Sequence, residues 1–149
     1  MKRPRIIRRG ETGQAMVEFS MLGIVLFIMI FGMIDAGRAV WNYNTLSQAT
    51  REGTRYAIVH GADSSNPSGP DSANFTAPSD DVMVRQTIEK FGAGLNPDRL
   101  TVESEWLDGS NARGNSVKVT SSYDYQPMFN FFGALSFTLS SSSTMEITN

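Results

Sequence analysis

Seven residues near the N-terminus, Gly13-Gln14-Ala15-Met16-Val17-Glu18-Phe19, combine a glycine, a carboxylate and the start of an apolar segment. A carboxylate in an apolar helix is costly, about 2.5–3.5 kcal/mol at the centre of a bilayer, so Glu18 needs a partner. If the chain is cut after Gly13, the new amine of Gln14 lies one helical turn from Glu18 on the same face. The missing Cβ of Gly13 also leaves room for extended backbone in a peptidase. The spacing therefore indicates cleavage between Gly13 and Gln14, followed by pairing of Glu18 with an amine.

The segment that must position these residues is long and apolar. Residues 14–34 contain Glu18 as their single charged side chain and, as a helix, would span about 31 Å, close to the hydrocarbon thickness of a bilayer. Residues 1–13 carry five Lys/Arg and one Glu, a charge of +4, whereas the chain from Asp35 onward carries eight Lys/Arg and thirteen Asp/Glu, a charge of −5. We therefore expect a basic cytoplasmic leader (1–13), a transmembrane helix (14–34) and an exported acidic body.

Three other interpretations of the apolar segment remain open. A buried core helix would be amphipathic, whereas the large apolar residues from Met21 to Phe31 cover every face. A cleavable secretory signal would end in small residues, and the sequence around Ile34 offers only a poor cleavage site. A plain signal anchor accounts for everything except Gly13 and Glu18.

Apolar or small residues continue at three- and four-residue steps beyond the apolar segment. They are Val40, Tyr43, Leu46, Ala49, Gly53, Tyr56 and Ala57. This pattern predicts a single helix of about 45 residues, whose second half, residues 35–60, is an amphipathic extension. Gly61 ends this helix, and residues 61–80 predict a flexible loop because Pro, Gly, Ser, Asn and Asp dominate them.

The remaining residues, 81–149, predict a small α+β head. A short helix comes first, with Val82, Ile88 and Phe91 facing inward. Alternating apolar residues then predict three strands, at residues 100–106, 117–125 and 135–147. An antiparallel sheet with one apolar face needs a cover, and the outer half of the long helix is the natural one. The expected fold class is α+β, with a long N-terminal helix packed on a small antiparallel sheet of about three strands.

The residue types that usually carry out catalysis do not indicate an enzyme in this chain. The chain has no cysteine, one histidine (His60) and no recognised nucleophile motif, so we expect no catalytic residues, no cofactor and no metal site. His60 is expected to interact with the dipole at the end of the long helix. The exported body has no basic patch suited to nucleic acid, which we therefore exclude as a partner.

Three segments resemble TadE-like proteins, the pseudopilins or minor pilins of bacterial Tad/Flp tight-adherence pilus systems. They are residues 13–19, Gly37-Arg38 and Ala49-Thr50-Arg51-Glu52-Gly53-Thr54-Arg55-Tyr56-Ala57; residues 117–123, Pro127 and the closing strand to Met145 resemble the family more weakly. Thr50 and Thr54 depart from the family pattern, which usually has small residues such as Ala at these positions.

The resemblance implies a pilin-like helix and membrane residence, with processing by a prepilin peptidase between Gly13 and Gln14. Glu18 would be the fifth residue of the mature chain and would pair with an amine, while Phe19 would contribute to processing and helix recognition. The implied partners are the peptidase, other pilins, the pilus assembly machinery and membrane lipid. The implied location is the bacterial inner membrane, with the head outside and possible incorporation in the pilus, and the implied role is pilus assembly in adhesion and biofilm formation.

Two alternatives to an assembly subunit remain. One is a membrane-anchored enzyme, for which no catalytic constellation is visible. The other is a single-pass adhesin or binding module that is not processed as a pilin, with Phe131, Phe132 or the loop 61–80 as its contact surface. Exposure of the two phenylalanines would favour the adhesin.

Overall fold

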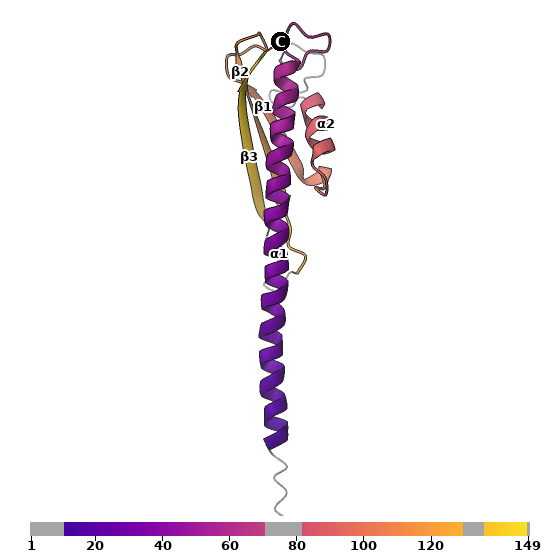
Figure 1. The fold of residues 1–149 in the computed structure, drawn as a ribbon, viewed down its shortest axis with the longest axis vertical. Helices are drawn as coiled ribbons and strands as arrows, with labels where there is room; N and C mark the ends of the chain where they lie inside the picture. Colours follow the sequence, from indigo (N-terminus) through magenta and orange to yellow (C-terminus); the bar gives the residue numbers. More distant parts are fainter. Residues whose placement is uncertain (1–10, 71–81, 130–135, 149) are drawn as a thin grey trace, which may run out of the picture.

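The structure, a computed structural model, describes residues 11–70, 82–129 and 136–148. Its elements are α1 (Glu11–Val59), α2 (Val82–Phe91), the 3-10 helix η1 (Pro97–Arg99), β1 (Leu100–Trp106), β2 (Ser116–Tyr125) and β3 (Phe137–Glu146). Figure 1 shows α1 as a rod whose first half projects alone, while its second half lies along the head. The α+β fold class and the single long helix are confirmed.

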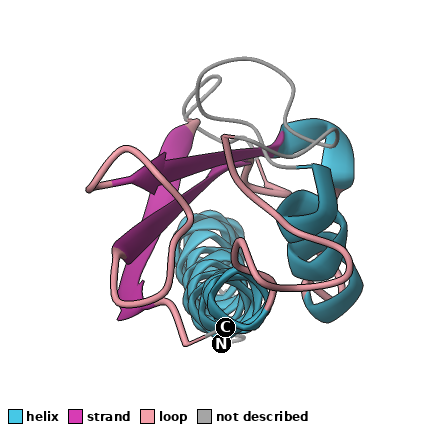
Figure 2. Ribbon diagram, turned by 90° about the horizontal axis from the view of Figure 1, so that it is seen from above, coloured by secondary structure: helices cyan, strands magenta, loops and turns pink. Residues whose placement is uncertain are grey.

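The second half of α1 is the central element of the head. It contacts α2, β2 and β3, and Figure 2, a view along α1, shows α2 on one side of it and the sheet on another. Leu46, Ala49 and Ala57 are fully buried in this core. Thr50 and Thr54 are also fully buried, and their hydroxyls donate to the carbonyl oxygens of residues 46 and 50, at 2.7 and 2.8 Å. Because these hydroxyls are satisfied within the helix, the two threonines can occupy core positions.

The sheet is antiparallel in the order β1-β2-β3. The predicted alternation is confirmed in β1 and β2, whose inward residues are buried: Leu100, Val102, Trp106, Val117, Val119, Tyr123 and Tyr125. The third strand differs from the prediction. It begins at Phe137, which is exposed, and its inward-facing residues are only half-buried. Leu135, where the strand was expected to begin, lies outside the described residues.

For two residues of α1, the prediction that they pack against the head is wrong. Val40 and Tyr43 are exposed. The face that packs against the head runs instead through Asp35, Ala39, Asn42 and Leu46, which are buried or half-buried. These four recur at three- and four-residue steps, whereas Val40 and Tyr43 are rotated away from them around the helix axis.

The inward face of α2 also differs from the prediction. Val84 and Ile88 are fully buried, whereas Phe91 is 51% exposed. A Cβ atom built on Gly53 of α1 would lie 2.5 Å from Cγ1 of Ile88, so the two helices are in contact at this glycine. Because the packing is fixed there, Phe91 reaches the edge of the helix pair rather than its core.

The first half of the predicted loop 61–80 is tied to the turn between β1 and β2. The N–H of Ala62 donates to the carbonyl of Asn111 at 2.9 Å, and the side-chain amide of Asn111 donates to the carbonyl of Ser68 at 2.8 Å. Gly69, with φ of +113°, brings its backbone against the indole of Trp106, where a Cβ atom would lie 2.8 Å from the ring. Residues 71–80, like Phe131 and Phe132, lie outside the described residues.

Candidate functional site

The N-terminal half of α1 is apolar and uncovered. Among the described residues, one helix, α1, is long and apolar enough to cross a membrane. It contains an 18-residue window with a mean hydropathy of 2.4, and this window is entirely unburied. The core helix of a soluble protein would be mostly buried, so the core-helix interpretation does not hold. An exposed apolar surface of this length is suited to lipid or to other helices.

Glu18 lies on this apolar half, at the start of the segment. The side-chain amide of Gln14 donates to Oε1 of Glu18 at 3.2 Å, across one helical turn. Phe19 is 77% exposed. Gly13 and Gln14 already belong to α1, which begins at Glu11. A peptidase that takes extended backbone would therefore have to unwind this first turn, where several N–H groups lack helical partners.

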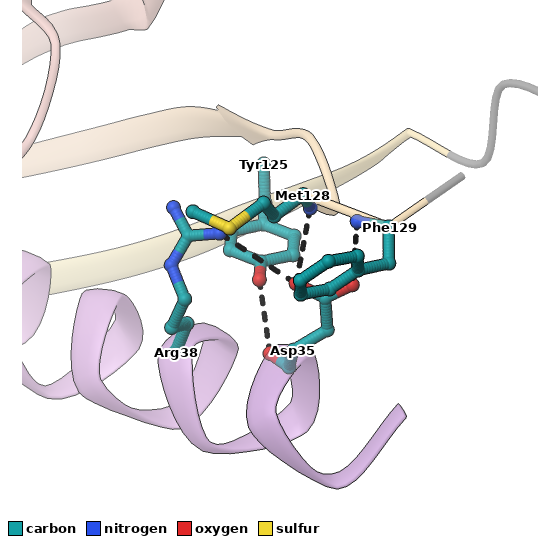
Figure 3. A network of polar contacts seen from close by, with 5 residues as sticks. All are labelled: Asp35, Arg38, Tyr125, Met128 and Phe129. Carbon is teal, nitrogen blue, oxygen red and sulfur yellow. Dashed lines mark hydrogen bonds and ion pairs between the residues drawn. The ribbon is translucent and has the colours of Figure 1, made fainter. Parts of the chain in front are cut away.

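A second polar cluster, which the sequence analysis missed, joins α1 to the head (Figure 3). The Asp35 carboxylate accepts hydrogen bonds from the N–H groups of Met128 and Phe129, each at 3.0 Å. The Tyr125 hydroxyl donates to the backbone carbonyl of Asp35 at 2.9 Å, and Nη1 of Arg38 lies 3.6 Å from Oδ1 of Asp35. We refer to these five residues as the Asp35 clasp. It fixes the end of β2 and the following segment to α1, immediately beyond the apolar segment.

Tyr125 is a neutral hydrogen-bond donor within the clasp. Burial raises the pKa of its hydroxyl, and the nearby Asp35 and Tyr123 raise it further, while Arg38 acts in the opposite direction. A phenol with a raised pKa keeps its proton at neutral pH, which the bond to the Asp35 carbonyl requires.

Residues 13–55 match the family model described as TadE-like protein. Over these residues the chain is similar to TadE-like proteins. No curated protein and no solved structure matches the chain. The matched segment contains Gly13, Gln14, Glu18 and Phe19. It also contains Asp35 and Arg38 of the clasp, whereas Tyr125, Met128 and Phe129 lie outside it. The C-terminal strands, for which the resemblance was weaker, lie outside the matched segment.

The head beside the TadE-like helix has two hollows at the junction of α1 and α2, and Phe91 and Glu52 border both. Arg51 and Gln48 line one of them, and His60 lines the other. His60 donates from Nδ1 to the carbonyl of Tyr56 at 2.9 Å, in the last turn of α1, as expected of a side chain at a helix C-terminus. In the described part of the chain, no three His, Asp or Glu side chains gather as metal ligands would.

Proposed function

We propose that this TadE-like chain is a minor pilin, or pseudopilin, needed to assemble a Tad/Flp-type pilus in bacterial adhesion and biofilm formation, and that it is not an enzyme. The observation that supports this function best is Glu18, the single charged residue of the apolar segment 14–34, on the half of α1 whose apolar 18-residue window is unburied in the part of the chain that the structure describes. The family match over residues 13–55 agrees with this role.

In this proposal a prepilin peptidase removes residues 1–13 and leaves an amine on Gln14. The 3.2 Å contact between the Gln14 side chain and Glu18 indicates that a group at residue 14 can reach the carboxylate. An amine from the same or a neighbouring subunit would then neutralise Glu18 in apolar surroundings, where an unpaired charge is strongly unfavourable. Phe19, exposed beside it, would contribute to recognition by the peptidase and by neighbouring pilin helices.

The same proposal fixes a location and a set of partners. The basic leader stays in the cytoplasm, α1 crosses the inner membrane once, and the acidic head lies outside. The partners are the peptidase, other pilins, the assembly machinery and the lipid around α1. The extended, uncovered half of α1 supports this arrangement because it can pack equally well against lipid and against other apolar helices.

Mass spectrometry of the N-terminal peptide of the mature chain, isolated from its own host, tests the processing step. We expect the chain to begin at Gln14, and a Gly13→Leu variant to retain its leader. Gly10→Leu, which leaves Gly13 in place, is the matched control and should be processed. A wild-type chain that still begins at Met1 would contradict the proposal and favour the unprocessed membrane-anchored adhesin.

Substitution of Glu18 tests the pairing step. Glu18→Ala should be cleaved and inserted normally, because the head lies on the other side of the membrane, yet crosslinking to partner pilins should fall at least about tenfold. Ser20→Ala, two residues away on the same exposed half, is the control. Normal piliation with Glu18→Ala as the only copy would argue for a passive anchor, which gains from losing a carboxylate.

A further inference from the structure

The segment after β2 continues along α1 toward the apolar half of the helix. The ring of Phe129 stacks on that of Phe31, with centroids 4.3 Å apart, and Phe31 in turn stacks on Phe27. Phe31 precedes Asp35 by four residues, about 6 Å along the helix axis, and belongs to the apolar segment 14–34. An aromatic side chain of the head therefore lies beside the part of α1 that is suited to lipid.

The backbone N–H groups of this segment are satisfied without water. Non-helical backbone lies at membrane depth only where its polar groups have partners within the protein. The N–H groups of Met128 and Phe129 both donate to the Asp35 carboxylate, and Pro127 has no N–H group (Figure 3). The backbone donors of all three residues are thus accounted for.

The surface on one side of the segment is apolar. Met128 is 62% exposed. A hollow of about 340 Å³ opens beside it, lined almost entirely by carbon: Asp35, Ala36, Ala39, Tyr125, Pro127 and Phe137. Trp41 and Tyr43, both exposed, lie one to two turns further along α1. Exposed tryptophan and tyrosine are typical of the interface between a membrane and water, so Trp41 and Tyr43 agree with a membrane surface close to this end of the apolar segment.

We propose that Pro127, Met128 and Phe129 insert into the outer leaflet of the bilayer, where lipid acyl chains contact Met128 and fill the hollow beside it. The proposal rests on the membrane-spanning role of α1. It adds a second lipid contact, made by the head itself, and assigns to Asp35 the role of satisfying the backbone that enters the lipid.

The absence of cysteine from the chain permits a direct test with single spin labels on the full-length protein. The labels are placed at Met128→Cys, at Leu22→Cys within the apolar half of α1, and at Thr144→Cys on the outer face of β3. The protein is reconstituted in vesicles of phosphatidylethanolamine and phosphatidylglycerol. Collision rates with oxygen, which partitions into lipid, and with a polar nickel chelate, which stays in water, are then measured for each label.

We expect the ratio of oxygen to nickel collisions at Met128→Cys to exceed that at Thr144→Cys several-fold and to approach that at Leu22→Cys. A label at the exposed Gln126 checks that the result does not depend on substituting Met128. A lipid-like ratio at Leu22→Cys with a water-like ratio at Met128→Cys would overturn the insertion while leaving the anchor intact. Water-like ratios at both sites would overturn the anchor and the insertion together. Few collisions with either reagent at Met128→Cys would mean that protein, not lipid, covers the segment.

Discussion

The two carboxylates at the ends of the apolar segment have opposite surroundings. Asp35 accepts hydrogen bonds from two backbone N–H groups and lies near Arg38. All of these partners belong to its own chain. Glu18 has the Gln14 amide as its hydrogen-bond partner, on an exposed helix. A carboxylate whose partners are fixed stabilises the fold, whereas a carboxylate on an uncovered apolar surface is available to another subunit. This contrast agrees with a structural role for Asp35 and with the assembly role proposed for Glu18.

Asp35→Asn tests the structural assignment. The amide keeps one acceptor oxygen, but its NH2 group faces a backbone donor, so one hydrogen bond is lost at a cost of about 1–3 kcal/mol. We expect amide hydrogen exchange at residues 128 and 129 to become about ten- to a hundredfold faster. Asp63→Asn, at an exposed position in the loop after α1, should leave these amides unchanged. Equal exchange in the two variants would contradict the role given to Asp35.

Because of Tyr125, the stability of the head should decrease at alkaline pH. Its raised pKa means that the folded chain holds a proton which the unfolded chain releases above about pH 10. The free energy of unfolding should therefore not change with this group below about pH 10 and should fall as the pH rises through the raised value. Tyr125→Phe should remove this part of the decrease, and Tyr43→Phe, at an exposed position, should not. Denaturant unfolding of the detergent-solubilised chain between pH 8 and 11 measures the difference.

The sequence predicted Glu18 but not the Asp35 clasp, for a physical reason. Glu18 is conspicuous because charge is costly in an apolar helix, and its partner position is one turn away. The two hydrogen bonds that the Asp35 carboxylate accepts come from main-chain N–H groups 93 and 94 residues further along the chain. Every residue except proline has such a group, so no residue type announces the contact. The only signals were a carboxylate directly after the apolar segment and a proline bend after β2.

Among the elements, α1, β1 and β2 follow their sequence patterns closely. Hydropathy and a 3.6-residue period run through α1, and strict alternation marks the two strands. The errors at Val40, Tyr43 and Phe91 have a common cause. A period identifies an apolar stripe, but the direction of that stripe depends on where the neighbouring element makes its closest contact, as at Gly53 and Ile88. The third strand was harder to place because serines occupy two of its four half-buried positions.

Gly53→Ala tests that close contact. Alanine favours a helix by about 1 kcal/mol over glycine, but its Cβ would meet the buried side chain of Ile88, and overpacking costs typically about 1–3 kcal/mol. We expect a net loss of stability in thermal unfolding. Gly37→Ala, where no atom lies within 4 Å of the added Cβ, should be neutral or stabilising. In an Ile88→Ala background the loss from Gly53→Ala should disappear, and its persistence there would exclude the steric explanation.

As a whole, the molecule is a 49-residue helix that carries its head on the half away from the N-terminus (Figure 1). This shape and the charge distribution predict the orientation. A cysteine at the exposed Arg113, in the turn between β1 and β2, should react with a membrane-impermeant maleimide applied to intact spheroplasts. Permeabilised cells give the full extent of labelling as a control. Reaction only after permeabilisation would place the head in the cytoplasm and reverse the topology.

The two ends of the head are both fastened to α1, and this has a mechanical consequence. At the apolar end the Asp35 clasp holds the segment after β2, and at the other end the N–H and hydroxyl of Thr148 donate to the carbonyl of Ile58, at 3.0 and 3.2 Å. Traction along α1, such as a subunit would experience when drawn out of a membrane, loads both attachments in shear at the same time. Bonds loaded together in shear rupture at higher force than bonds peeled one after another, so the head should travel with its helix as a rigid unit.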